Sequence, residues 1–218
     1  MDLLTSLNHR KCNIIFLISA PSGTGKSSVC RRILEKVSNI EYSVSFTTRK
    51  PREGEVDGKD YYFIESPAFK EMIRNNEFAE WELVHENFYG TAIKSISNAF
   101  KKKHDLLLDI DVKGAKKIRK LYHDAVFIYL LPPSFSELKL RLENRMTENS
   151  EEIEMRFKNA LGELLHFIEY DFAIFNDNLD VAVNKILSII EIEKYRVSRI
   201  DKLEEIKNKI KELSSSER

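Results

Sequence analysis

The chain has 218 residues, which suits one domain with small insertions. Hydrophobic residues make up 42% and charged residues 32%, so a buried core can form, and a disordered or fibrous protein is excluded. The 35 basic residues balance 35 acidic ones, which leaves no global positive field for nucleic acid or an anionic membrane. Cys12 and Cys30 are the only cysteines, so we expect a reducing, cytoplasmic compartment and no disulfide framework.

The first predicted element is a buried strand over Ile14–Ser19. Arg10 and Lys11 precede this apolar run, as in a signal peptide, but the run ends after Ala20 in a glycine-rich segment. A short β-branched run of this kind is typical of a strand that leads into a loop. No apolar stretch of the sequence reaches the length of a membrane span, so we expect no membrane-spanning segment.

Apolar runs that alternate with helical spacing predict an α/β fold. Val29, Ile33 and Val37 recur at helical spacing after the first strand, and Ser134 with Glu137 forms a capping box that opens a later helix. Buried strands between helices favour a largely parallel central sheet. The predicted strands are Ile14–Ser19, Tyr42–Thr47, Leu106–Ile110, Val126–Leu131 and Phe172–Phe175.

The strongest local signal is the glycine-rich segment after the first strand. It fits the phosphate-loop pattern, except that Ala20 stands where the strict pattern has glycine. Gly23 and Gly25 let successive N–H groups turn toward a phosphate, and Lys26 adds a positive charge. The Ser27 hydroxyl suits a Mg²⁺ ligand, and the following helix directs its positive end at the same anion. We predict a three-layer phosphate-loop NTPase fold. The residues assigned to the nucleoside triphosphate are Ala20, Pro21, Ser22, Gly23, Thr24, Gly25, Lys26, Ser27 and Ser28.

A second apolar strand, over Leu106–Ile110, ends among acidic residues. In phosphate-loop enzymes an aspartate at such a strand end commonly reaches Mg²⁺, directly or through water. Asp109 is the nominal match, but Asp111 lies close enough in sequence to serve the metal or to face a second substrate. A structural role, such as capping a helix at Gly114, is a third possibility for this acidic pair.

Two arginines three residues apart suggest a second anion site. Pro51 disfavours a helix at the preceding residue, so Arg49 and Arg52 should lie on a loop or extended chain and can converge on one ligand. Guanidinium groups bind phosphate bidentately. Tyr61 and Tyr89 add phenolic donors within segments rich in turn residues. An arginine pair alone is a weak signal, because most such pairs are solvated surface.

Six motifs in register resemble the guanylate kinase family. They are SAPSGTGKS at 19–27, SFTTRKPR at 45–52, GEVDGKDY at 54–61, FAEW at 78–81, YGT at 89–91 and LDID at 108–111. The resemblance runs from about Ile14 to about Ile190 and implies an enzyme that phosphorylates GMP with ATP and Mg²⁺. The residues it assigns to GMP are Ser45, Arg49, Arg52, Tyr61, Glu80, Tyr89, Thr91 and Asp111.

The chemistry of guanine fits two of these assignments. Guanine presents N1–H and N2–H₂ as donors and O6 as an acceptor. The Glu80 carboxylate can accept from both donors, and the Ser45 hydroxyl can donate to O6. Adenine would leave a buried Glu80 badly paired, and such a mismatch discriminates strongly. Without the family resemblance, Glu80 would pass for an ordinary surface acid.

The resemblance also implies a catalytic set rich in arginine. Phosphoryl transfer between two polyanions depends on alignment and on neutralising the charge of the moving group. Lys26 would act from the phosphate loop, with Ser27 and Asp109 holding Mg²⁺. Arg141 and Arg145 are spaced to share one helix face, and Arg156 follows in the next helical segment. These three arginines would belong to a mobile lid that excludes water on closure.

The expected organisation follows from these segments. We assign 1–41 and 92–140 to the core, 42–91 to a GMP-binding lobe, 141–157 to the lid, and 158–218 to the return of the core and a C-terminal helix. A helical pattern runs from Asp180 to Leu213, and we expect this helix to pack on its own domain, with a dimer contact as the alternative. Oligomeric state is left open.

Two rival functions compete with this interpretation. One is a kinase for another nucleoside monophosphate or a small alcohol, against which the pair of Glu80 and Ser45 argues. The other is a scaffold with a guanylate-kinase-like domain that binds phosphopeptides and has lost catalysis. Such scaffolds usually have eroded phosphate loops, whereas Lys26, Ser27 and Arg49 are all present here.

Overall fold

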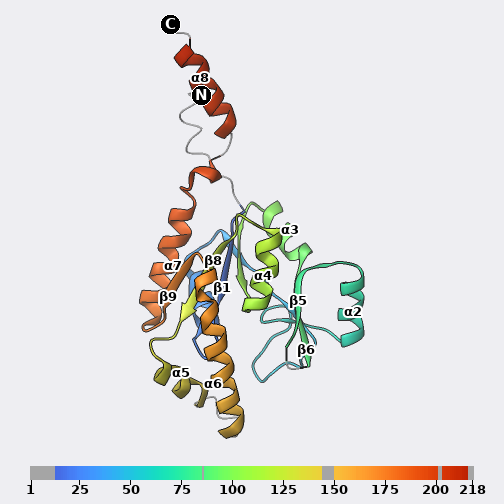
Figure 1. The fold of residues 1–218 in the computed structure, drawn as a ribbon. Helices are drawn as coiled ribbons and strands as arrows, with labels where there is room; N and C mark the ends of the chain where they lie inside the picture. Colours follow the sequence, from blue (N-terminus) through green and yellow to red (C-terminus); the bar gives the residue numbers. More distant parts are fainter. Residues whose placement is uncertain (1–12, 85, 144–149, 201–202, 216–218) are drawn as a thin grey trace.

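The computed structural model describes residues 13–84, 86–143, 150–200 and 203–215. Within these ranges, a five-stranded parallel sheet, the core sheet, lies at the centre in the order β2-β7-β1-β8-β9 (Figure 1). Every residue of β1 is buried, as expected for a parallel sheet covered on both faces. The strands are β1 (Ile15–Ser19), β2 (Ile40–Tyr42), β7 (Asp105–Asp109), β8 (Val126–Leu131) and β9 (Phe172–Phe175).

Helices cover both faces of the core sheet, which confirms the predicted three-layer α/β fold. α1 (Lys26–Lys36) and α7 (Leu179–Glu193) share one apolar cluster with the sheet, while α3 (Ile93–Lys101) and α4 (Val112–Leu121) share the other. Successive residues of β1 point to opposite faces, because side chains alternate along a strand. No helix within the described ranges is long and apolar enough to cross a membrane.

A second, smaller sheet lies beside the core (Figure 1). Its strand order is β4-β3-β6-β5, and β5 and β6 form an antiparallel hairpin. Phe69 of the adjoining helix stacks on Phe78, with 4.4 Å between the ring centroids, and on Phe88. These rings hold the helix to the sheet. The elements are β3 (Phe46–Thr47), β4 (Tyr62–Phe63), α2 (Ser66–Arg74), β5 (Phe78–Val84) and β6 (Asn87–Ala92).

The single strand predicted over Tyr42–Thr47 is wrong. β2 ends at Tyr42, and the Ser43 N–H still binds the Leu107 carbonyl, 3.0 Å away, at the edge of the core sheet. The chain then crosses to the small sheet, where β3 pairs with β4 and β6. The run of strand-forming residues continues through this crossing, so its pattern does not show that two sheets share it.

Two further helices and a short 3-10 turn follow β8. They are α5 (Phe135–Glu143), α6 (Ser150–Leu164) and η2 (Leu165–Glu169). The Glu137 N–H donates to the Ser134 hydroxyl at 3.0 Å, which confirms the predicted start of α5. Leu138 and Leu142 of α5 pack with Ala160 of α6 against the buried Tyr129 of β8.

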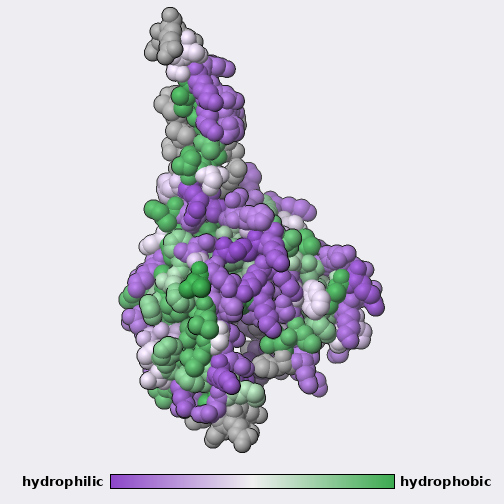
Figure 2. All heavy atoms as spheres, viewed as in Figure 1, coloured by the Kyte–Doolittle hydropathy of each residue, from purple (hydrophilic) through white to green (hydrophobic). Residues whose placement is uncertain are grey.

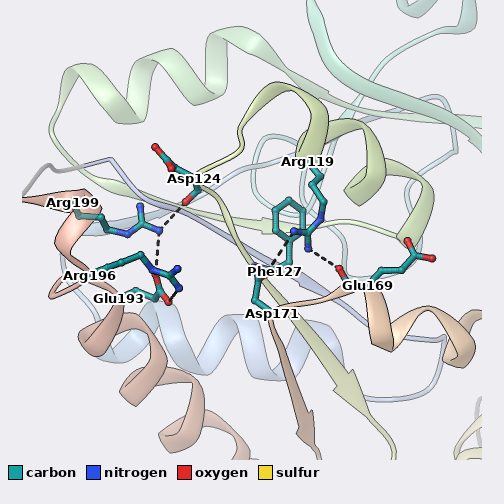
Figure 3. Close-up of polar contacts among 8 residues, drawn as sticks. All are labelled: Arg119, Asp124, Phe127, Glu169, Asp171, Glu193, Arg196 and Arg199. Carbon is teal, nitrogen blue, oxygen red and sulfur yellow. Dashed lines mark hydrogen bonds and ion pairs between the residues drawn. The ribbon is translucent and has the colours of Figure 1, made fainter.

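The prediction of one helix from Asp180 to Leu213 is also wrong. α7 ends at Glu193, the turn η3 (Val197–Arg199) follows, and α8 (Leu203–Ser215) extends away from the three layers (Figure 1). Among the described residues of α8, only Ile206 is buried, whereas the expected packing on the domain would bury a whole face of the helix. At this break, the buried Arg199 forms an ion pair with Glu193 at 3.2 Å and donates to the Asp124 carbonyl at 2.8 Å (Figure 3). These contacts hold the turn η3 against the end of α7.

A second polar cluster ties η2, β8 and the segment between η2 and β9 to α4 (Figure 3). The Arg119 guanidinium lies 3.6 Å from the centroid of the Phe127 ring and donates to the Glu169 carbonyl at 2.8 Å. Arg119 is also paired with Asp171. Along the same face, a hydrophilic patch covers α4, whose exposed residues include Lys113, Lys116 and Lys120 (Figure 2).

Candidate active site

The predicted phosphate loop connects β1 to α1 at the carboxyl end of the core sheet. Gly23 and Gly25 have φ values of 88° and 92°, a left-handed conformation that favours glycine. Gly25 caps α1 without a side-chain hydrogen bond, so the N–H groups of the first turn can bind an anion. Ser27 and Ser28 stand exposed in that first turn. The local geometry is that of an anion cradle.

The two predicted acids, Asp109 and Asp111, have different partners in the structure. Lys26 Nζ lies 2.5 Å from Asp109 Oδ1 and 3.3 Å from the Ile110 carbonyl oxygen. Burial alone would lower the pKa of Lys26, but the Asp109 carboxylate raises it above its ordinary value, so the ammonium stays charged. Asp111 instead caps α4, because its Oδ1 accepts from the Gly114 N–H at 2.8 Å. The helix cap considered for this acidic pair is thus formed by Asp111.

A cavity of about 400 Å³ opens beside the loop. The Thr24 carbonyl is held from two sides, by Asn176 Nδ2 at 2.7 Å and by Arg141 Nη1 at 3.4 Å. Arg141 is further fixed by Glu137, whose Oε1 accepts from its Nε at 2.8 Å. The structure thus brings the predicted Arg141 to the loop. The cavity is lined by Gly23, Gly25, Ser28, Arg141, Asn176, Asp177 and Leu179.

Asn176 is a site residue that the sequence analysis missed. It is buried and follows directly after β9, whose strand was predicted correctly. Since ligands of open α/β sheets bind outside the carboxyl ends of the strands, a polar residue at this position was a usable signal.

The small sheet holds a second cluster of predicted residues. Arg49 forms a bidentate pair with Glu55, at 2.9 Å from Nη1 to Oε2 and 2.8 Å from Nη2 to Oε1. Its guanidinium also lies 5.4 Å from the centroid of the Tyr61 ring, which packs edge-on against Tyr89. The Arg49 guanidinium lowers the pKa of Glu55, so this carboxylate is ionised. Glu55 was not singled out from the sequence, although it lies within the GEVDGKDY motif.

Glu80 is the buried acid of the site. It lies on β5, is 6% exposed, and its Oε1 accepts from the Thr91 hydroxyl on β6 at 2.6 Å. Burial, aided by the charge of Asp111 and opposed by the Thr91 hydrogen bond, raises the pKa of Glu80 to about 7. A buried carboxylate with a raised pKa is stabilised most by a ligand that presents N–H donors.

The remaining predicted residues of this group are Ser45, Arg52, Arg145 and Arg156. Ser45 lies half-buried between β2 and β3, and Arg52 has an exposed side chain while its N–H binds Glu55. Arg156 is half-buried on α6. Arg145 lies outside the described residues, as does the middle of the predicted lid.

Tyr61 connects the two clusters. Burial raises the pKa of Tyr61, Asp109 raises it further, and Lys26 opposes the rise. Tyr61 belongs to the segment that leads into β4, whereas Asp109 and Lys26 belong to the core. Tyr61 therefore lies within range of the charges of Lys26 and Asp109, while its ring contacts Arg49.

Comparisons with known proteins agree with this geometry. The family model described as guanylate kinase matches residues 13–193. The chain belongs to the guanylate kinase family. The guanylate kinase of Caldanaerobacter subterraneus is 43% identical over 190 residues, covering 87% of this chain and 92% of the relative. That of Syntrophotalea carbinolica is 46% identical, covering 88% and 91%.

A solved structure supports the same membership. The crystal structure of guanylate kinase from Anaplasma phagocytophilum has a TM-score of 0.77 and 33% identity, covering 90% of this chain and 94% of that one. The resemblance predicted from the six motifs is confirmed. The guanylate kinase match ends at Glu193, the last residue of α7, so α8 lies beyond the matched region.

Proposed function

We propose that this member of the guanylate kinase family transfers the γ-phosphoryl group of ATP to GMP, giving ADP and GDP. The observation that supports this reaction best is the left-handed glycine loop that begins α1 with Lys26, together with a second cationic cluster in which Arg49 contacts Tyr61, a ring within range of the Lys26 charge. A phosphoryl transfer requires that a donor and an acceptor phosphate come together in line.

Guanine would bind at Glu80. Its carboxylate would accept from N1–H and N2–H₂, with the Ser45 hydroxyl donating to O6. Thr91 already holds one oxygen of Glu80, and Asp111 lies close enough to raise the pKa of that acid. Adenine offers a lone pair at N1, so AMP would leave a buried acid unpaired at considerable cost.

The phosphate of GMP would bind among the side chains at the edge of the small sheet. The Arg49 fork and the Tyr61 and Tyr89 hydroxyls are already gathered there, and Arg52 would join them from its exposed loop. None of these described contacts addresses a ribose hydroxyl, so we include dGMP as an acceptor.

ATP would bind along the loop Ala20–Ser28, with its triphosphate on the first turn of α1. An oxygen of the GMP phosphate attacks the γ-phosphorus, and the bond from that phosphorus to the β–γ bridging oxygen breaks as ADP leaves. Lys26 and Arg141 would neutralise the negative charge of the transferred phosphoryl group. Arg145 and Arg156 would contribute further positive charge from the lid. The reaction uses no nucleophile from the protein.

The residues present fit a magnesium ion shared with the nucleotide. Ser27 and Asp109 supply a hydroxyl and a carboxylate near the loop, and no group of three or more His, Cys, Asp or Glu within the described ranges could hold a metal by itself. Mg²⁺ suits this donor set, since it usually retains water and takes further ligands from phosphate. When bound, it would offset negative charge on the β- and γ-phosphates.

The test is a coupled assay of ADP release with ATP, Mg²⁺ and each nucleoside monophosphate. We expect GMP, and dGMP to a lesser extent, to outpace AMP, UMP and CMP by orders of magnitude. Comparable rates with AMP would contradict the guanine assignment. Absence of turnover with every acceptor in folded protein would favour the phosphopeptide scaffold instead. We also place the enzyme in the cytoplasm, without nucleic acid or membrane partners.

A further inference from the structure

The Glu80 carboxylate is confined on both of its oxygens. Oε1 accepts from the Thr91 hydroxyl at 2.6 Å. Oε2 lies against Gly114 of α4, where a Cβ atom would stand only 2.8 Å from Oε2 and 3.2 Å from the carboxyl carbon. One oxygen is therefore fixed by a hydrogen bond, and the other rests on a position that has no side chain.

We propose that Gly114 is a positioning residue that sets the location of Glu80 for guanine recognition. This inference rests on the proposed function. Gly114 occupies the first turn of α4 and is not among the glycines with positive φ, so its backbone conformation does not require glycine. Alanine is the better helix former, so helix stability does not favour glycine either. The space that Glu80 occupies is the feature that excludes a Cβ.

The contact joins the small sheet to a helix of the core. Glu80 belongs to β5 of the small sheet, whereas α4 covers the core sheet. Lys117, nearly one turn beyond Gly114, forms an ion pair with Glu82 at 2.8 Å and donates to the Trp81 carbonyl, so α4 also holds the part of β5 that directly follows the acid. The core helix thus determines how far the guanine-reading carboxylate reaches toward the core.

A Cβ at this position must displace something, and the structure indicates what moves. The nearest atoms are the end of the Glu80 side chain, and the next is the Ile110 methyl at 3.3 Å. A side-chain end shifts more readily than packed backbone, so Gly114→Ala would push the carboxylate away from α4 and leave the fold intact. The substitution would weaken the binding of GMP, since hydrogen bonds to guanine depend on the positions of both carboxylate oxygens.

The experiment compares two glycine-to-alanine substitutions in helices. Gly114→Ala should raise KM for GMP by on the order of tenfold while KM for ATP and the melting temperature stay near wild-type values. Gly162→Ala on α6 is the matched control, because a Cβ there meets nothing within 4 Å. This control should leave both KM values unchanged. Equal rises in both KM values for Gly114→Ala, or no rise for GMP, would overturn the proposal.

A second pair of variants separates positioning from folding. Glu80→Asp shortens the acid by one methylene and clears the space beside Gly114. Adding Gly114→Ala to Glu80→Asp should therefore raise KM for GMP further by less than twofold, well below its effect in the wild-type background. A full tenfold addition would contradict a contact between the two residues. If Glu80→Gln affected ATP and GMP equally, the assignment of Glu80 to the guanine base would fail, whatever Gly114 does, whereas comparable turnover of AMP and GMP by the wild-type enzyme would contradict the proposed function.

Discussion

The two proposed anion sites of this kinase are built from different parts of the polypeptide. The core site is made by main chain: two left-handed glycines and the first turn of α1. The small-sheet site is made by side chains, with Arg49 held by Glu55 and set beside Tyr61. A main-chain cradle is fixed by the local fold, whereas a side-chain cluster depends on contacts that a single substitution can remove.

In both sites, nevertheless, the cationic side chain is paired with a carboxylate. Lys26 forms an ion pair with Asp109, and Arg49 forms one with Glu55. Each carboxylate thus orients its cation and stabilises the charged form. The difference is one of chemistry, since the core uses a compact ammonium and the small sheet uses a planar fork. Substitutions should therefore affect catalysis on the core side and acceptor binding on the small-sheet side.

The largest expected effect is on the core side. Lys26→Ala removes the charge nearest the phosphate loop and should lower kcat by about 10³-fold, because transition-state charge is then less neutralised. Steady-state kinetics with saturating ATP and GMP measures this, and circular dichroism should show an unchanged fold. A near-normal kcat would mean that the cradle has been misassigned.

Glu80→Gln tests the acceptor side at the base. The amide presents one donor where guanine also presents donors, so KM for GMP should rise about 10²-fold while KM for ATP changes little. Varying each substrate at saturation of the other separates the two constants. An equal effect on ATP would assign Glu80 to the fold and not to the base.

Arg49→Lys tests the acceptor side at the phosphate. Lysine retains the positive charge but loses the bidentate fork, so KM for GMP should rise on the order of 30-fold. Arg32→Lys, on the exposed face of α1, is the matched control and should behave as wild type. Retention of normal GMP binding by Arg49→Lys would show that charge alone suffices at this site.

The smallest effect is a pH dependence that should distinguish the two sides. Because burial raises the pKa of Glu80 to about 7, most of this acid is protonated at pH 6 and ionised at pH 8. Guanine donors need the ionised form, so KM for GMP should fall about tenfold as pH rises from 6 to 8. Lys26 stays charged throughout, since Asp109 offsets its burial and raises its pKa.

The control for this profile is Glu80→Gln measured over the same range. It retains any contribution from titration of the GMP phosphate and lacks that of the acid. The difference between the two profiles should show a single transition near pH 7. Parallel profiles for the two proteins would assign the dependence to the nucleotide.

The sequence predicted best those features whose determinants are adjacent in the chain. The phosphate loop, the strand before it and the start of α5 all depend on residues within a few positions of one another. The boundary between the two sheets was missed because strand-forming residues continue from β2 into β3. The break after Glu193 was missed because it depends on Arg199 reaching Asp124, 75 residues away.

The site shows the same division. Lys26, Arg49 and Glu80 were found through motifs, and the structure supplied their partners Asp109, Glu55 and Thr91. The partners of Asn176 and Gly114 required tertiary packing: a polar residue directly after β9 was a signal for a site, but the sequence does not show that Asn176 contacts Thr24 or that Gly114 contacts Glu80. Their pattern on the chain is that of an ordinary loop polar residue and an ordinary helix glycine.

Trp81 is the sole tryptophan of the chain and lies beside Glu80 on β5. The Lys117 ammonium stands 5.0 Å from its ring centroid, so the indole lies at the junction between the small sheet and α4. Indole emission is quenched and shifted by a nearby charge. The intrinsic fluorescence of the unlabelled enzyme is consequently sensitive to the Lys117 charge at that junction, without any added dye.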